Sequence, residues 1–230
     1  MTNHPKINSL RLAALFSSIS LFIMTLAAAF SYGFVNNQIF VNTDPLLTLS
    51  NLKEASGLFK AGLLGWLLII VTDVLVSWGF YVFFLKTNRK ISTLGAIFRL
   101  SYVALLITAV INLVQISRIA SSANMVSDSI DPGHIMILFQ QFDYFWSLGL
   151  ILFGFHLICI GFLASKDHQV PNFIGLLLLI AGLSYALIHI LYRFFPDFHA
   201  FTTTLETLLS LPMIVGELGF GIWLWIKGGK

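Results

Sequence analysis

Long apolar runs dominate the chain, and short polar or charged segments separate them. Six runs are long enough to cross a hydrocarbon core of about 30 Å, which takes roughly 20 helical residues. The apolar residues do not alternate with polar ones as in barrel strands, and an open sheet would leave backbone groups unpaired in lipid. The pattern therefore predicts an all-α fold, a polytopic transmembrane helix bundle of about six spans. The expected spans are 10–34, 57–85, 93–116, 144–163, 171–194 and 203–226.

The composition also indicates that lipid surrounds most of the chain. Of its 230 residues, 57% are hydrophobic and 10% charged, against about 25% charged in an ordinary soluble domain. The mean hydropathy is +0.89. The net charge of +3 comes from cations scattered at the ends of apolar runs, without the basic stripe that binds nucleic acid. We expect one domain, 1–230, with the bilayer as its partner and no nucleic acid.

The distribution of cations predicts the orientation, because positive charge is retained on the cytoplasmic side. Both termini are expected in the cytoplasm. The cations on that side are Lys6, Arg11, Lys86, Arg89, Lys90, Lys166, Lys227 and Lys230, against Lys53, Lys60, Arg118 and Arg193 opposite. The first span has the small-residue pattern of a cleaved signal peptide at 27–29, but its apolar run continues to Phe34, which favours a retained span.

Two connections on the opposite side are longer than a turn. The first, 36–56, contains Asn, Thr and Pro45, and we expect irregular structure packed on the mouth of the bundle. In the third, Asp131 and Pro132 form a helix-start signal, so the fourth span is expected to begin near Pro132. The tryptophans lie mostly toward span ends and are expected to be interfacial anchors. They are Trp66, Trp78, Trp146, Trp223 and Trp225.

Four ionisable residues fall inside the spans: Asp73, Arg99, His156 and Glu217. At 1.5 Å per helical residue, each lies about 13–20 Å from the nearest cytoplasmic cation, so we expect them in one layer. Tyr102, three residues after Arg99, shares nearly the same helix face. Arg99 is expected to bind Asp73 or Glu217, and His156 to donate to the other carboxylate or share its proton.

This polar layer allows two interpretations. It can be a clasp that holds helices together, or it can line a cavity that binds a polar head or relays protons. Two glycine pairs with seven-residue spacing, Gly154 with Gly161 and Gly175 with Gly182, mark faces where another helix can approach closely. Pro212 permits a kink near the layer.

The common catalytic and cofactor motifs are not found in the sequence. It has no HExxH, no P-loop, no dinucleotide glycine fingerprint, no nucleophile elbow and no paired-histidine metal motif. We therefore expect no catalytic residue, no metal and no cofactor.

Several short segments are similar to those of one bacterial family of membrane proteins. They are Thr72-Asp73, 96–100, 153–157, 170–175, 181–185, 216–218 and 223–228. The family is catalogued as domain of unknown function 4386 (DUF4386). The resemblance implies a single multi-pass domain in a bacterial cytoplasmic (inner) membrane, with its first span retained, and it implies no activity.

Three functional hypotheses follow. In the first, the polar layer binds a small or amphiphilic molecule in transport or sensing, with Arg99 as anion anchor and His156 with a carboxylate as the proton-sensitive element. In the second, the chain is a non-catalytic scaffold or subunit with a structural clasp and a fully packed apolar centre. The third, a lipid-modifying enzyme, ranks last because Tyr102 and Cys159 have no evident base. The sequence does not identify a protein partner, although the second hypothesis has the outer connections meet one.

Overall fold

A computed structural model of the chain describes residues 9–122 and 131–230, and within these ranges every regular element is a helix. Six helical runs are long and apolar enough to cross a membrane, as predicted. The elements are α1 (Ser9–Ala28), the π-helical segment η1 (Ala29–Asn36), α2 (Asn37–Ile39), α3 (Pro45–Glu54), α4 (Ser56–Phe84), α5 (Arg89–Ser122), α6 (Pro132–Lys166), α7 (Asn172–Phe194), the 3-10 turn η2 (Pro196–Phe198) and α8 (His199–Ile226).

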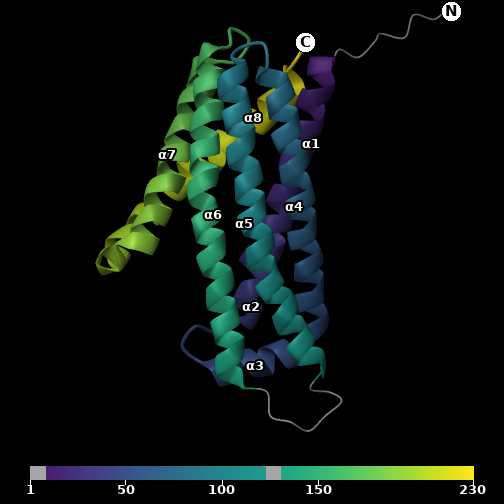
Figure 1. The fold of residues 1–230 in the computed structure, drawn as a ribbon, viewed down its shortest axis with the longest axis vertical. Coiled ribbons are helices and arrows are strands. Elements are labelled where there is room, and N and C mark those ends of the chain that lie inside the picture. The colour runs from purple at the N-terminus through teal and green to yellow at the C-terminus, as the bar shows by residue number, and fades with distance from the viewer. Residues whose placement is uncertain (1–8, 123–130) are drawn as a thin grey trace, which may run out of the picture.

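The six long helices form a closed ring in chain order. Each packs on the next, from α1 to α4, α5, α6, α7 and α8, and α8 returns to α1 through the least extensive contact of the ring. The start of α1 and the end of α8 lie at one end, which we call the termini end, and α3 lies at the other (Figure 1). Toward the α3 end, α7 and α8 lean away from the remaining helices (Figure 1).

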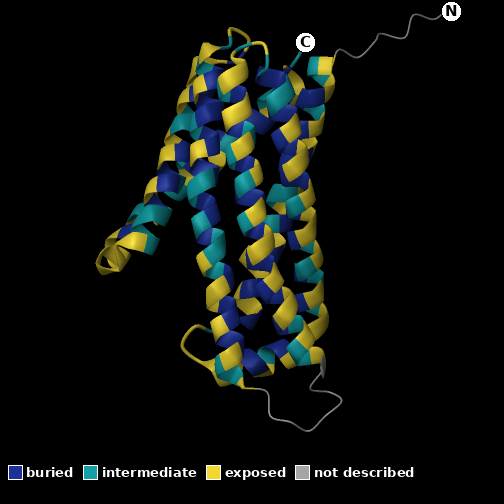
Figure 2. Ribbon diagram, viewed as in Figure 1, coloured by how far each residue is buried: buried dark blue, intermediate teal, exposed yellow. Residues whose placement is uncertain are grey.

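The outward faces of the ring carry apolar side chains, because these faces of a membrane protein contact lipid rather than water. Leu26, Leu64, Leu208 and Leu211 are between 68% and 72% exposed. Figure 2 shows exposed positions along the outer faces of the bundle and buried positions toward its interior. The helices extend beyond the predicted spans, as in α6, because polar residues end an apolar run without ending a helix. Lys6, one of the cations used for orientation, lies outside the described residues.

Two helices begin with the same Asp-Pro signal. The Asp131 side chain accepts a 2.9 Å hydrogen bond from the backbone N–H of Gly133, which confirms the predicted start of α6. Asp44 accepts one from Leu47, also at 2.9 Å, and opens α3. The prediction of irregular structure in this first connection was therefore wrong, because Pro45 stands at the first helical position, where a missing N–H costs nothing.

The most extensive helix contact in the ring joins α6 to α7 along two facing pairs of glycines. A Cβ atom placed on Gly154 would lie 2.6 Å from the backbone nitrogen of Ala186 and 2.7 Å from the carbonyl oxygen of Gly182. One placed on Gly161 would lie 2.9 Å from the carbonyl oxygen of Gly175. The predicted close approach at both glycine pairs is therefore confirmed.

At the termini end, Arg11 ties α1 to the last turn of α8. Its guanidinium donates to the carbonyl oxygens of Leu224 at 3.0 Å, Gly228 at 2.9 Å and Trp225 at 2.6 Å. The carbonyl oxygen of Leu224 also accepts from the backbone N–H of Gly228 at 3.1 Å. A cation at this helix end also complements the helix dipole.

Replacing Arg11 by Met is expected to destabilise the protein by about 1–2 kcal/mol, because three carbonyl oxygens lose a charged donor. The stability of Arg11→Lys should lie between that of the parent and that of Arg11→Met, since a single ammonium cannot reach three carbonyls at once. The measurement is unfolding in mixed micelles, with Arg89→Met at an exposed position of the same end as control. Equal losses in both variants would contradict a specific role for Arg11.

Candidate functional site

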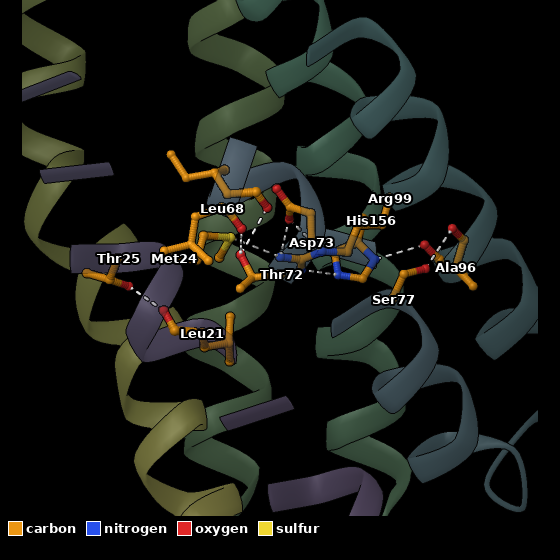
Figure 3. Close-up of polar contacts among 12 residues, drawn as sticks. Leu21, Met24, Thr25, Leu68, Thr72, Asp73, Ser77, Ala96, Arg99 and His156 are labelled. Carbon is orange, nitrogen blue, oxygen red and sulfur yellow. Dashed lines mark hydrogen bonds and ion pairs between the residues drawn. The ribbon is translucent and has the colours of Figure 1, made fainter. Parts of the chain in front are cut away.

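Asp73, Arg99 and His156 meet in the interior of the bundle, on α4, α5 and α6. Nε of Arg99 donates to Oδ1 of Asp73 at 2.9 Å, and Nη2 donates to the same oxygen at 2.6 Å. Nη1 of Arg99 lies 3.0 Å from Nε2 of His156. Figure 3 shows the guanidinium between the carboxylate and the imidazole. The three residues are at most 1% exposed, so the layer is fully buried and joins three helices.

The partners of His156 fix its tautomer. Its Nδ1 lies 2.8 Å from the carbonyl oxygen of Gly95, which can only accept a hydrogen bond, so Nδ1 carries the proton. Nε2 faces a guanidinium, which can only donate, so Nε2 accepts. His156 is therefore a neutral imidazole that orients Arg99. It does not donate to a carboxylate, which corrects the expectation from the sequence.

Arg99 is enclosed on every side. Besides Asp73 and His156, its Nη2 lies 3.6 Å from the sulfur of Met24. The ring centroids of Phe80 and Phe153 lie 5.9 Å and 5.2 Å from the guanidinium carbon, so aromatic faces also contact the cation. Each guanidinium nitrogen already has a partner, which argues against the expected role of Arg99 as an anion anchor.

A partly open pocket of about 240 Å³ lies beside this layer, inside the ring of helices. Three of the five residues singled out from the sequence, Asp73, Tyr102 and Glu217, line it. Arg99 and His156 do not line it. Arg99 instead lines, together with Glu217, a separate space of about 10 Å³.

The base of the pocket carries polar atoms without a partner. Oδ2 of Asp73 and the indole Nε1 of Trp66 are buried and have no hydrogen bond within the described part of the chain. Glu217 stands on the other side of the pocket, where Arg99, Asp73 and Tyr185 interact with it electrostatically. Buried polar groups in proteins are nearly always hydrogen-bonded to protein or to water, so these atoms have room to bond to a water or to another polar group in the pocket.

The mouth of the pocket lies between α1 and α8. These helices touch at the termini end, where Phe22 packs on Trp225 with ring centroids 6.1 Å apart. Toward the α3 end α8 leans away (Figure 1), and both helices turn side chains into the pocket. Ile214 of α8 is exposed, and the other lining residues from α1 and α8 are partly exposed, as are Trp146 and Tyr185, whereas those from α4 and α5 are buried. The lining residues from α1 and α8 are Met24, Thr25, Ala28, Ile214, Glu217 and Leu218.

The exposed part of the pocket lies on the membrane-spanning part of α8. Ile214, which is 52% exposed, precedes the end of α8 at Ile226 by about 18 Å at the rise of an α-helix. In a hydrocarbon core about 30 Å thick, this distance corresponds to the middle of a span that begins at Ile226.

Sequence reasoning missed the aromatic wall of this pocket. Trp66, Trp146, Phe153 and Tyr185 all line it. The sequence favours Trp66 and Trp146 as interfacial anchors, but Trp66 is only 2% exposed. A signal was available, because Trp66 falls seven residues before Asp73 and so on nearly the same face of the same helix.

Fold and site together define a polytopic α-helical membrane protein with a buried ion pair beside a partly open pocket. The model of one protein family, described as a domain of unknown function (DUF4386), matches residues 17–228. The chain belongs to the DUF4386 family. An uncharacterised protein from Archaeoglobus fulgidus is 29% identical over 168 residues, which make up 73% of this chain and 84% of that protein. No solved structure matches the chain.

Proposed function

We propose that this protein binds an amphiphilic molecule that enters the pocket from the membrane, in transport or sensing. The observation that carries the proposal is the unpartnered Oδ2 of Asp73 at the base of a pocket whose mouth is apolar. An amphiphile satisfies both parts at once, because its head can bond to the polar base while its tail stays in hydrocarbon.

Two irregular stretches of helix beside the mouth support a function that involves movement. The π-helical segment η1 begins directly after Ala28, and Pro212 lies inside α8 two residues before Ile214. Breaks in regular helix geometry are common where helices bend or serve a functional site. A ligand between α1 and α8 would therefore act on the two helices whose mutual contact is the least extensive.

The ion pair itself supports the structural part of the scaffold hypothesis. Asp73, Arg99 and His156 join α4, α5 and α6 in a fully buried clasp. The fully packed apolar centre that this hypothesis requires is at odds with the pocket beside the clasp. We therefore infer that the clasp supports the wall of the pocket. Asp73 is part of the clasp and also lines the pocket.

We also propose a location in the cytoplasmic membrane of a bacterium, and the charge distribution supports an orientation with the termini end inside. Arg11, Lys86, Arg89, Lys166 and Lys227 all lie at or near that end. Since cytoplasmic ends retain cations, the α3 end would face outward, and the pocket would open toward the outer half of the bilayer.

A fluorescence experiment tests amphiphile binding. The protein is a variant in which Trp66 and Trp146 are the only tryptophans left. Brominated single-chain amphiphiles added to its dodecyl maltoside micelles should quench the tryptophan emission in a saturable way. Ala28→Phe should weaken this binding about tenfold or more, because the new ring fills the mouth.

The matched control is Ala29→Phe, at an exposed neighbouring position that does not line the pocket. It adds the same ring to the same helix and should leave the quenching curve unchanged. Linear, non-saturating quenching in the parent, Ala28→Phe and Ala29→Phe alike would mean that the tails contact only the outer surface, and the proposal would fail.

A further inference from the structure

The charges that line the pocket select among amphiphiles. Both carboxylates of the polar layer, on Asp73 and Glu217, line it, while the guanidinium of Arg99 does not. One cation and two carboxylates leave one negative charge without a cation in this layer. In low dielectric that charge requires either a proton or a cationic ligand.

The remaining wall is suited to a cation. Five aromatic residues line the pocket, and the rings of Trp66 and Trp146 lie 5.5 Å apart at 77° to each other, so their faces point in different directions. Several aromatic faces around a small space, next to a carboxylate, are the recurring arrangement for organic ammonium groups. The five are Trp66, Tyr102, Trp146, Phe153 and Tyr185.

The size of the pocket sets a limit on what enters. About 240 Å³ is below the roughly 300–1,000 Å³ of pockets that enclose a whole drug-sized ligand. The pocket therefore holds a head group and a short length of chain, and the rest of an alkyl tail extends through the mouth between α1 and α8. A bulky phosphodiester or sugar head does not suit such a space.

Taking these observations together, we propose that the ligand is a lipophilic amine or other organic ammonium amphiphile, bound by Glu217, by Oδ2 of Asp73 and by the aromatic wall. This inference rests on the proposed function and names its ligand class. A proton and the ammonium head would compete for Glu217. The charged and titratable groups that interact with Glu217 are Arg99 and Asp73 on one side and Tyr185 and Tyr102 on the other.

The test compares three probes with the same tail in the two-tryptophan background: ω-bromododecyl trimethylammonium, ω-bromododecanol and ω-bromododecyl sulfate. At equal mole fraction in maltoside micelles, the ammonium should bind about tenfold or more tightly than the alcohol, and the sulfate most weakly. Lowering the pH should weaken only the ammonium. This ranking is measured in a protein with the whole pocket intact, so it does not depend on any pocket variant folding.

Variants then locate the effect. Glu217→Gln should remove the preference for ammonium, and its pH dependence, while alcohol binding is retained. Glu206→Gln changes a carboxylate on the same helix outside the pocket, so it should behave as the parent.

The outcomes separate the two proposals. Equal binding of ammonium and alcohol, both weakened by Ala28→Phe, would overturn the ammonium inference and leave amphiphile binding standing. Tightest binding of the sulfate would also overturn it. Saturable quenching by none of the probes would overturn both.

Discussion

Replacing Arg99 by Met is expected to destabilise the protein by about 3–5 kcal/mol, because it leaves the buried carboxylate of Asp73 without its cation. The aromatic faces of Phe80 and Phe153 also lose their contact with the guanidinium. The measurement is unfolding by denaturing detergent in mixed micelles. Arg89→Met, at an exposed position at the start of the same helix, is the control.

A double variant separates lost charge balance from lost packing. Asp73→Leu combined with Arg99→Met removes both charges and should recover more than half of the stability lost in Arg99→Met, because no ion is left unpaired in the interior. If the double variant is no more stable than Arg99→Met, the unpaired carboxylate of Asp73 is not the cause of the loss, and this explanation fails. If Arg99→Met is as stable as the parent, the clasp has no structural role.

The polar layer could be predicted from the sequence because it rests on depth alone. A helix rises a fixed distance per residue, so counting from flanking cations brings Asp73, Arg99 and His156 to one level before any packing is known. The choice between Asp73 and Glu217 as partner of Arg99 could not be made this way. It depends on the rotation of each helix in the ring, which is set by contacts such as the glycine seam between α6 and α7.

The pocket could not be predicted, because it arises from an angle between helices. The sequences of α1 and α8 do not indicate that the two helices are in contact at Phe22 and Trp225 and then diverge. Without the pocket, Trp66 and Trp146 have no visible role beyond anchoring. The wrong prediction of irregular structure at α3 has another cause. The Asp-Pro signal at 44–45 is the same as the one at 131–132, which correctly predicts the start of α6, so the start of α3 was predictable in the same way.

Replacing Gly154 or Gly182 by Leu is expected to separate α6 from α7, with a loss of about 1–3 kcal/mol or more in each case. A Cβ on Gly182 would lie 2.7 Å from both the carbonyl oxygen of Gly154 and the backbone nitrogen of Ile158. Backbone atoms cannot rotate away as a side chain does, so one helix must shift as a whole. Because α7 also supplies Tyr185 to the pocket, the shift should weaken amphiphile binding together with stability.

A glycine in open space provides the matched control for this last prediction. A Cβ on Gly219, in α8, would meet no atom within 4 Å, so Gly219→Leu changes the same residue type in a similar setting without a clash. It should be neutral or stabilise the protein by a few tenths to about 1 kcal/mol, since glycine is the less favourable residue inside a helix. Unfolding in mixed micelles compares the variants directly. Equal losses at positions 154 and 219 would contradict the seam and mean that any added bulk disturbs the helices.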